Sequence, residues 1–330
     1  MPDLAWYFPE TLEDVPALLQ KDGVITHAGG TGLAASRLRR IKGLVDLSRL
    51  PLSFFRNAGG GEDGSCQLGS MLNYRETADR IAKIDESHVL VRALAGAAST
   101  PLRNRITLGG SMAYYPMWSD LMGPLIALEV ELTLLGAEER RVSLVDYLRK
   151  PHLRQKHLIA AIHLKSTDPK AGEQKVYYHR ETRTAVDYPA FTLTILLRDG
   201  RAGKPQARIV LSGVKGKYIR EEKLEETVGT RGPEGLDENL IDAQLEAEFT
   251  SRRFGSPEYL RHLAVVAIER GFHRLAEGLH RPADAEDPGR RWQRGTIPVR
   301  RRDLRGRNDH QADAQFHHET NRVRELVRAH

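Results

Sequence analysis

Two short glycine-rich segments are the part of this sequence whose residue types and spacing can do chemistry. Ala28–Leu33 reads AGGTGL and Thr107–Ser111 reads TLGGS, so each places adjacent glycines beside a hydroxyl residue. Glycine accepts positive φ and has no Cβ, so consecutive backbone N–H groups in such a turn can converge on an anion. A helix that begins directly after the turn adds the positive end of its dipole. Each segment is therefore a candidate anion-binding turn, although a tight strand-to-helix connection would explain one such segment by itself.

The presence of two turns favours a ligand with two phosphate groups. A diphosphate has two phosphoryl groups, and two facing turns can hold both. Neither segment has the G-x-G-x-x-G spacing of the Rossmann fingerprint or the G-x-x-x-x-G-K-[ST] spacing of a P-loop. The sequence therefore predicts a dinucleotide that is bound without a Rossmann turn.

The composition is typical of a soluble globular protein. The chain has 330 residues, of which 40% are hydrophobic and 28% are charged. No apolar run approaches the roughly 20 residues of a membrane helix. The N-terminus, MPDLAWYFPETLEDV, has acidic residues where a secretory signal has basic and apolar ones. We therefore expect a cytoplasmic protein without a membrane span.

Charge and metal-ligand residues argue against several other classes. Much of the formal charge of +6 comes from the Arg-rich residues 281–330, and basic residues do not interleave with aromatic ones as in a nucleic-acid surface. Cys66 is the single cysteine, so the chain cannot form an internal disulfide or a Cys-based zinc or iron–sulfur site. His152, His157 and His163 share one segment but lack a carboxylate or cysteine at ligand spacing. We predict no metal site and no nucleic-acid partner.

The elements that would position the two turns form a first block, residues 1–152. The pattern predicts a short helix opened by Thr11–Asp14, and then a strand near 24–27 that leads into the first turn. The other predicted elements are a helix through Arg40, a strand at 44–47, a hairpin of strands 52–56 and 65–68 with a glycine-rich tip at 59–64, helices near 73–84 and 87–97, an apolar helix from Ser119 and a strand at 129–134.

Residues 153–280 form a second block in which strand-like runs come first and helices last, which is typical of an α+β domain. The strand-like runs lie at 157–164, 175–179, 190–197 and 207–211, and the helices at 236–249 and 256–279. Residues 281–330 contain no lysine, several prolines and little periodicity. We predict that most of this tail is disordered.

The first block resembles the FAD-binding subunit, or middle domain, of the molybdenum hydroxylases, the family of xanthine dehydrogenase and carbon-monoxide dehydrogenase. That family opens with an aromatic-Pro segment like Trp6–Asp14, and its first flavin motif, A-G-G-[TH]-[DS]-L, matches Ala28–Leu33 except at Gly32. Its second motif, R-N-x-A-T-[IL]-G-G-[ND], is similar to Arg103–Ser111. Its P-x-S-D-L-x-P-x-L-x-A-L segment is similar to Pro116–Leu128. The resemblance implies that the glycines belong to an FAD pyrophosphate clamp.

The likeness covers about residues 3–280 and implies an α+β fold. The expected architecture is a two-part FAD-binding domain of the PCMH (vanillyl-alcohol-oxidase-like) type, followed by an α+β C-terminal domain of three to four strands and helices. The domains would be 1–152 for FAD binding, 153–280 for the domain like that of carbon-monoxide dehydrogenase flavoproteins, and 281–330 for the tail.

The segment Tyr177–Pro189 parallels a motif of the family's second domain, usually written [FY]-x-K-x-x-x-R-x-x-x-D-[FYW]-[AP], which lies beside the flavin ring. Arg183 keeps the arginine of this motif. The Asp-aromatic-Pro ending leans toward the 4-hydroxybenzoyl-CoA reductase type of flavoprotein, without the cysteine-bearing insertion of that type. His179 stands where the motif has lysine, so a donor to a flavin carbonyl there would have a charge that depends on pH.

The resemblance also implies roles for single residues. The N–H groups of both turns would cradle the pyrophosphate, and the Thr31 and Ser111 hydroxyls would donate to it. Asp120 would accept hydrogen bonds from ribityl or ribose hydroxyls, or, in the simpler alternative, interact only with a helix dipole. No residue is assigned to catalysis. The predicted cofactor-binding residues are Ala28, Gly29, Gly30, Thr31, Gly32, Leu33, Thr107, Leu108, Gly109, Gly110, Ser111, Asp120, His179 and Arg183.

The function that the resemblance implies is electron transfer within a multi-subunit dehydrogenase. FAD would take electrons from the [2Fe-2S] clusters of a small partner subunit and pass them to NAD+, a quinone or O2. A molybdopterin-binding large subunit would hydroxylate the substrate. Two alternatives stay open: a stand-alone FAD-dependent oxidoreductase with its own substrate pocket, and a non-enzymatic role in which the Arg-rich tail binds nucleic acid or an acidic partner.

Overall fold

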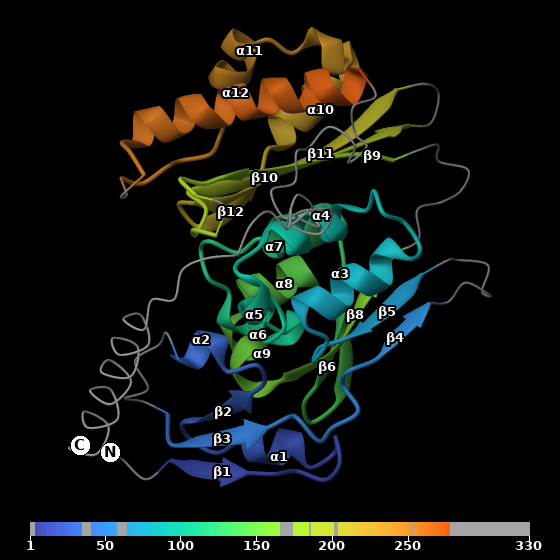
Figure 1. The fold of residues 1–330 in the computed structure, drawn as a ribbon, viewed down its shortest axis with the longest axis vertical. Helices are drawn as coiled ribbons and strands as arrows, with labels where there is room; N and C mark the ends of the chain where they lie inside the picture. Colours follow the sequence, from blue (N-terminus) through green and yellow to red (C-terminus); the bar gives the residue numbers. More distant parts are fainter. Residues whose placement is uncertain are drawn as a thin grey trace, which may run out of the picture. The chain divides into compact units, whose positions relative to one another are not determined.

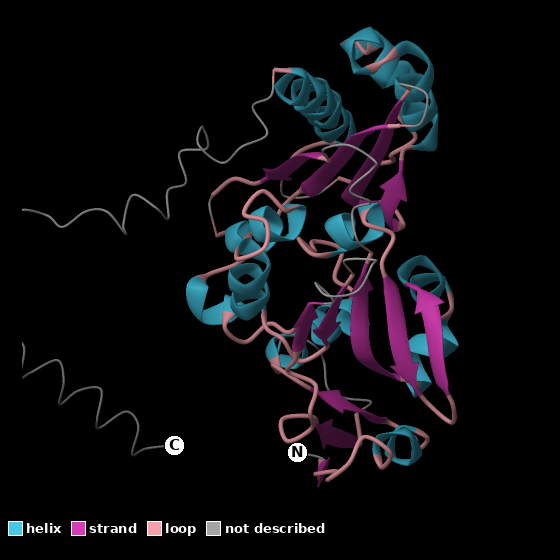
Figure 2. Ribbon diagram, turned by 90° about the vertical axis from the view of Figure 1, so that its right-hand side faces the viewer, coloured by secondary structure: helices cyan, strands magenta, loops and turns pink. Residues whose placement is uncertain are grey.

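The computed structural model describes residues 4–34, 41–57, 65–165, 174–184, 186–200, 204–251 and 254–277. Parts of three predictions lie outside these ranges: the end of the helix through Arg40, the hairpin tip at 59–64 and the tail at 281–330. The described residues belong to one compact unit, Met1–Asp284, and form three β-sheets (Figures 1 and 2).

The first sheet is parallel, in the order β1-β3-β2, and it positions the first glycine turn. Its strands are β1 (Ala5–Tyr7), β2 (Val24–His27) and β3 (Gly43–Asp46). Helix α1 (Val15–Leu19) follows directly on the predicted opening segment, in which the carboxylate of Asp14 accepts hydrogen bonds from the N–H and hydroxyl of Thr11; Asp14 is the N-cap but makes no side-chain hydrogen bond to the helix. Strand β2 ends at the turn, and helix α2 (Thr31–Ala34) follows it.

The second sheet is antiparallel, with the order β4-β5-β8-β6-β7. Its strands are β4 (Phe55–Asn57), β5 (Cys66–Gly69), β6 (Glu131–Leu135), β7 (Glu139–Ser143) and β8 (Leu158–Leu164). The predicted hairpin is confirmed, since β4 pairs with β5. Strand β8, which the sequence pattern groups with the second block, is instead the central strand of this first-block sheet. All seven of its residues are buried, so its apolar run indicates a central strand without indicating which sheet it joins.

After α2, seven further helices of the first block lie in the described ranges. They are α3 (Tyr74–Ala82), α4 (Val89–Gly96), α5 (Thr100–Arg103), α6 (Leu108–Tyr114), α7 (Met122–Ala127), α8 (Leu144–Arg149) and α9 (Pro151–Lys156). Asn73 and Glu76 form a capping box that fixes the start of α3. A continuous apolar core joins all of these helices except α5 to the second sheet and includes Leu90 (α4), Met112 (α6), Leu125 (α7) and Ile162 (β8).

The third sheet is antiparallel, in the order β12-β11-β10-β9, and belongs to the second block. Its strands are β9 (Lys175–Glu181), β10 (Phe191–Asp199), β11 (Pro205–Val214) and β12 (Lys217–Arg220). Helix α12 (Pro257–Ala276) covers one face of the sheet, and α4 and α7 pack on the other (Figure 1). The sheet therefore joins two cores, one on each face.

The other helices of the second block differ from the prediction. Helix α10 (Glu222–Arg231) and a short 3-10 turn, η4 (Pro233–Gly235), come before α11 (Glu238–Gln244), which is shorter than the predicted 236–249. The chain is extended after α11 because the buried carboxylate of Glu221 accepts hydrogen bonds from the N–H groups of Glu246 and Ala247, at 2.8 and 3.0 Å. This contact comes from a residue that is distant in the sequence, so local periodicity does not reveal it.

Three buried hydroxyl groups lie where α7 meets the third sheet. Thr192, Thr194 and Ser212 are at most 3% exposed, and none of their hydroxyl oxygens has a hydrogen-bond partner within the described structure. A Cβ on Gly123 of α7 would lie 3.0 Å from Thr194 Oγ1 and 3.3 Å from Ser212 Oγ. Glycine at position 123 therefore allows the helix to approach the sheet this closely.

Two variants at this contact should change stability in different ways. Thr194→Val should leave the free energy of unfolding unchanged or raise it by up to about 1 kcal/mol, because valine keeps the shape and removes an unpaired hydroxyl. Gly123→Ala should lower it by about 1–3 kcal/mol, because the added methyl group pushes α7 away from the sheet. Urea denaturation measures both. A Thr194→Val variant that loses more than about 1 kcal/mol would show that this hydroxyl makes a stabilising hydrogen bond in solution.

Candidate functional site

The first glycine turn is shaped by its backbone and by a neighbour that is distant in the sequence. Gly30 has a φ of +76°, in the left-handed region where side chains are disfavoured. A Cβ on Gly29 would lie 1.7 Å from the carbonyl oxygen of Arg105, so the two backbones touch. Arg105 Nη2 also lies 3.4 Å from the carbonyl oxygen of Gly29. Glycine is thus required at position 30 by conformation and at position 29 by close approach.

The structure brings the two glycine segments side by side. Besides the contact of Gly29 with the segment before Thr107, a Cβ on Gly110 would lie 4.0 Å from the Cβ of Ala28. One turn further along, Gly32 faces the ring of Tyr114, with 3.0 Å between its ideal Cβ position and Tyr114 Cγ. Helices α2 and α6 therefore pack together directly behind the turns.

The N–H groups of the first turn are available to a ligand. Among the described residues, the N–H groups of Gly29, Gly30 and Thr31 have no hydrogen-bond partner. Thr31 opens α2, where the first N–H groups of a helix have no acceptor within it. The remaining two predicted residues of this segment, Gly32 and Leu33, lie within α2. The turn therefore presents a row of unused donors, as an anion requires.

The N–H groups of the second turn, in contrast, donate within the protein. Leu108 donates to the Leu72 carbonyl at 2.9 Å and Gly109 to the Ser70 carbonyl at 2.8 Å. Gly110 donates at 3.1 Å to the hydroxyl of Thr107, which is the N-cap of α6. The predicted role of the Gly109 N–H as a pyrophosphate donor therefore does not agree with its contact, since a local acceptor already holds it.

Ser111 is also held inside the protein. It is 7% exposed, and its hydroxyl accepts a hydrogen bond from the Tyr74 hydroxyl at 2.9 Å. Burial raises the pKa of Tyr74, so this hydroxyl stays a neutral donor. Ser111 thus anchors α6 to α3 as an acceptor, and its own proton is left to donate, so the direct contact of its hydroxyl with a pyrophosphate stays a prediction.

Asp120 lies in a buried ion pair that joins the first block to the third sheet. It is 7% exposed, and its Oδ1 lies 2.6 Å from Nε of Arg180 and 2.9 Å from the hydroxyl of Tyr178. Burial raises the pKa of the Asp120 carboxyl, while the Arg180 guanidinium and the Tyr178 hydroxyl act in the opposite direction. Asp120 comes two residues before α7, so its carboxylate is bound by side chains of β9 and is more than a partner of the helix dipole.

Alternation along β9 separates His179 from Asp120. Tyr178 and Arg180 face Asp120, whereas Tyr177 and His179 point to the face covered by α12. His179 Nε2 lies 3.0 Å from Glu181 Oε2. Arg180 is not among the predicted residues, although the period of two along β9 places it on the side of Asp120. The structure therefore brings Arg180, and not His179, to this part of the site.

The segment after β9 is exposed and continues from the ion pair. Arg180 Nη2 donates to the Asp187 carbonyl at 2.5 Å, which holds the segment against the site. The ring of Tyr188 lies 4.9 Å from the ring of Trp118, and both side chains are exposed. Arg183 is exposed as well and makes no hydrogen bond or ion pair with the described residues. The structure does not bring Arg183 together with the glycine turns through any such contact.

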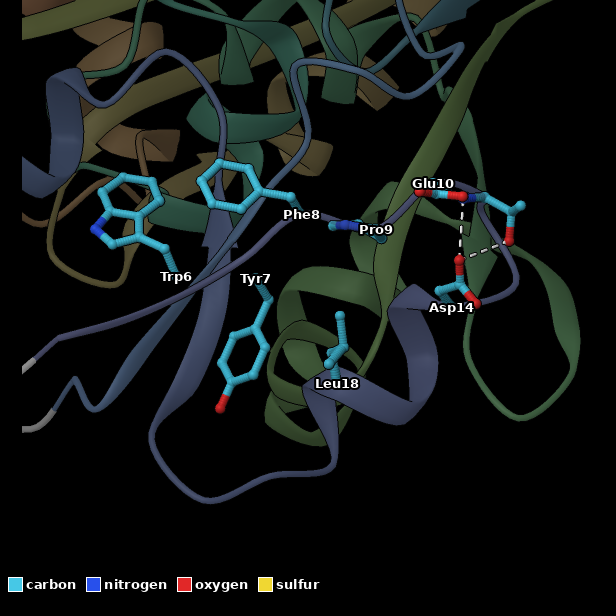
Figure 3. Close-up of a pocket in the computed structure, with 8 residues that line it drawn as sticks. Trp6, Tyr7, Phe8, Pro9, Glu10, Asp14 and Leu18 are labelled. Carbon is cyan, nitrogen blue, oxygen red and sulfur yellow. Dashed lines mark hydrogen bonds between the residues drawn. The ribbon is translucent and has the colours of Figure 1, made fainter.

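A separate hollow of about 620 Å³ lies along the N-terminal aromatic-Pro segment (Figure 3). Trp6 and Phe8 stack on one side of the strand, and Tyr7 lies on the other side near Leu18. The Trp6 ring meets His27, at the end of β2, edge to face at 5.0 Å. None of the predicted cofactor-binding residues lines this hollow, so it is distinct from the paired turns.

Neither a metal-ligand cluster nor a membrane-spanning helix occurs among the described residues. No group of three or more His, Cys, Asp or Glu side chains there is arranged to hold a metal ion. None of the helices in those ranges combines the length and apolar character that a bilayer crossing needs.

The paired turns and the sheets that hold them define a class of protein. Residues 2–165 match the family of FAD binding domains in molybdopterin dehydrogenase, and the chain belongs to this family. The match ends directly after β8, the strand that completes the second sheet. The cofactor of this domain is FAD, and the protein is a flavoprotein of the oxidoreductase class.

Individual relatives cover most of this chain. The protein YgfM of Escherichia coli K12, described as uncharacterized, is 25% identical over 268 residues, which are 80% of this chain and 93% of YgfM. A chain of quinoline 2-oxidoreductase from Pseudomonas putida 86 has the same fold, with a TM-score of 0.72 and 21% identity over 85% of this chain and 99% of that one. A chain of carbon monoxide dehydrogenase from Oligotropha carboxidovorans also has this fold, with a TM-score of 0.72 and 22% identity over 83% of this chain and 98% of that one. The expected fold, a two-part FAD-binding domain followed by an α+β domain, is confirmed.

Proposed function

We propose that this chain is the FAD-binding subunit of a molybdenum hydroxylase-type complex, in which it takes electrons from a partner's [2Fe-2S] cluster and passes them to NAD+, a quinone or O2. The observation that carries the proposal is the first glycine turn, whose N–H groups at Gly29, Gly30 and Thr31 have no partner in the described structure and lie beside Gly110. A diphosphate satisfies such donors.

The residues present fit FAD. The N–H groups of Gly29, Gly30 and Thr31 would bind the pyrophosphate, the Thr31 hydroxyl would add a donor, and Gly110 leaves the space beside Ala28 free of a side chain. Asp120, held in place by Arg180 and Tyr178, would accept a ribityl or ribose hydroxyl with its remaining lone pairs. Bound FAD would supply the electron-transfer chemistry, while the protein supplies position and charge.

The partners belong to the same proposal. One similar structure is described as carbon monoxide dehydrogenase from Hydrogenophaga pseudoflava that lacks the Mo-pyranopterin moiety of the molybdenum cofactor, so that protein is a molybdenum enzyme. By analogy, a molybdopterin-binding large subunit would act on the substrate, and a small [2Fe-2S] subunit would deliver its electrons to this chain. The acceptor is NAD+ or another oxidant.

Purification with co-purifying partners tests the proposal. The chain should carry about one FAD per polypeptide, identified by its visible absorption and by chromatography after release. Rapid mixing of a reduced [2Fe-2S] partner with the chain should bleach the flavin absorption. A colourless chain that cannot be reconstituted with FAD would contradict the proposal, whereas steady turnover of a small substrate by the isolated chain would favour a stand-alone oxidoreductase.

A further inference from the structure

A second cavity, of about 740 Å³, lies between the first-block helices α7 and α8 and strand β12. None of the predicted cofactor-binding residues lines it. Its apolar surface comes from Leu125, Ile126, Val130, Leu144, Leu148 and Ile219. Small-molecule sites in proteins have volumes of roughly 300–1,000 Å³ and combine apolar walls with a few polar groups. The size and walls of the cavity therefore fit a small organic ligand.

Tyr115 gives the cavity a buried donor without a partner. The residue is 8% exposed, lines the cavity, and its hydroxyl makes no hydrogen bond in the described structure. Its ring packs against Tyr218 at 6.3 Å between centroids, and the ammonium of Lys217 lies 4.1 Å from its centroid. Burial raises the pKa of Tyr115, so its hydroxyl keeps its proton. Buried hydroxyl groups in proteins are generally hydrogen-bonded, and a ligand in the cavity would provide the missing acceptor.

The backbone around the cavity adopts uncommon conformations. Among the described residues, four that are not glycine have positive φ, and three of them meet here: Tyr115 (+45°), Glu129 (+52°) and Lys217 (+80°). Tyr115 and Glu129 line the cavity, and Lys217 Nζ donates to the Tyr115 carbonyl at 2.8 Å. Such conformations persist where surrounding structure enforces them, and they cluster at ligand sites.

The carboxylates that line the cavity are compensated by cations. Glu129 lies 3.2 Å from Arg208 and 3.4 Å from Arg220. Glu131 lies 2.6 Å from Arg141 and 3.8 Å from Lys165. The third lining acid, Glu222 in the first turn of α10, interacts with the Arg220 guanidinium and with the helix dipole.

Arg149 is the lining cation that forms no ion pair. No carboxylate oxygen of the described residues lies within 4.0 Å of it, although Asp146, which pairs with Lys150 at 3.0 Å, is close enough to interact with it electrostatically. The guanidinium of Arg149 instead interacts with the hydroxyl of Tyr218, which is also next to Tyr115. The exposed Arg149 guanidinium and the buried Tyr115 hydroxyl are therefore two lining donors that both lie next to Tyr218.

We propose that this cavity binds a small organic anion with an apolar body, such as an aromatic carboxylate or sulfonate. The anionic group binds Arg149 and the Tyr115 hydroxyl, and the rings lie on the apolar surface. The site does not depend on the flavin function.

Binding of anilinonaphthalene sulfonate to the FAD-loaded chain tests the site, with fluorescence as the readout and benzoate as a competitor. The probe should bind saturably at one site per chain. Arg149→Gln should weaken its affinity by about 10-fold or more, as expected when a charged hydrogen-bond partner of an anion is lost. The control, Arg140→Gln, removes the same charge from an exposed residue that pairs with Glu138 and does not line the cavity, and should change affinity by less than about 2-fold.

A second variant separates binding from folding. Tyr115→Phe should weaken the probe by about 3-fold to 10-fold while leaving the melting temperature and the FAD content unchanged, because the hydroxyl it removes has no partner in the free protein. Equal losses in Arg149→Gln and Arg140→Gln would show only surface attraction and overturn the proposal. It is also overturned if the probe does not saturate, or if neither Arg149→Gln nor Tyr115→Phe changes its affinity.

Discussion

Arg180→Met should lower the free energy of unfolding by about 3–5 kcal/mol at neutral pH, because it leaves the carboxylate of Asp120 buried without a counter-ion. Both side chains are almost inaccessible, with 12% and 8% exposed, so water cannot replace the lost partner. The variant should also lose affinity for FAD, because Asp120 then keeps its hydrogen bond from Tyr178 and loses the one from Arg180 that helps to fix its position. Urea denaturation and flavin titration measure the two effects.

The pH dependence and a double variant identify the cause. Burial raises the pKa of Asp120, so the folded chain keeps this proton to higher pH than the unfolded chain, and stability from this group is lost as pH rises through the folded pKa. Without Arg180 the pKa rises further, so the deficit of Arg180→Met should shrink as the pH is lowered toward about 4, the ordinary range of the group. Adding Asp120→Asn should recover most of the stability at neutral pH. A deficit that is independent of pH and not relieved by the second change would mean that packing, and not the buried charge, is responsible.

Gly29→Ala should weaken FAD binding by about 100-fold or more, equal to about 2.7 kcal/mol. The added Cβ would stand 1.7 Å from the carbonyl oxygen of Arg105, and this is a backbone atom that no rotamer change can move. The two segments must therefore separate, and the N–H groups of the first turn lose their position. Equilibrium titration of the stripped protein with FAD, followed by flavin fluorescence, gives the affinity.

The matched control lies three residues further along, in helix α2. Gly32→Ser adds a Cβ whose nearest neighbour is the ring of Tyr114, at 3.0 Å, and a ring can shift by a few tenths of an ångström. Serine is also one of the residues that the family motif has at this position. FAD affinity should change by less than about 5-fold, which is within about 1 kcal/mol. Similar losses in both variants would show that the turn tolerates no side chain and that the Arg105 contact is not the deciding one.

The local parts of the fold could be predicted from the sequence, and the long-range parts could not. The Thr11–Asp14 start of α1, the hairpin of β4 and β5, and the long apolar face of α12 all depend on neighbours in the chain, and each is where the pattern predicts it. Strand β7 has the sequence ERRVS, and its exposed charged residues lack the apolar alternation that predicts a strand. Helix α11 ends earlier than predicted because the Glu221 carboxylate binds the backbone that follows it. Pattern alone has no access to such contacts.

The candidate site divides in the same way. Motif spacing identifies both glycine segments, and the structure places them in contact, but the donors differ between them. Whether the N–H of Gly109 is free depends on the Ser70 carbonyl, nearly 40 residues earlier in the chain. The choice between His179 and Arg180 depends on which face of β9 meets Asp120, and thus on how the third sheet packs. Resemblance to a motif identifies the segment that belongs to the site, whereas the packing decides which of its side chains faces the site.

The position of β8 has a consequence for how the chain reaches its native state. In the second sheet, β8 lies between β5 and β6 and pairs with both. Because β8 is the last of the five strands in the chain, β5 and β6 leave the ribosome before their common partner. Until it arrives, both present unsatisfied edges that can recruit another molecule. Joining Gly69 to Ala161 also closes a loop of more than 90 residues, which slows assembly. A fragment cut at residue 152 would keep this incomplete state permanently and would therefore tend to aggregate.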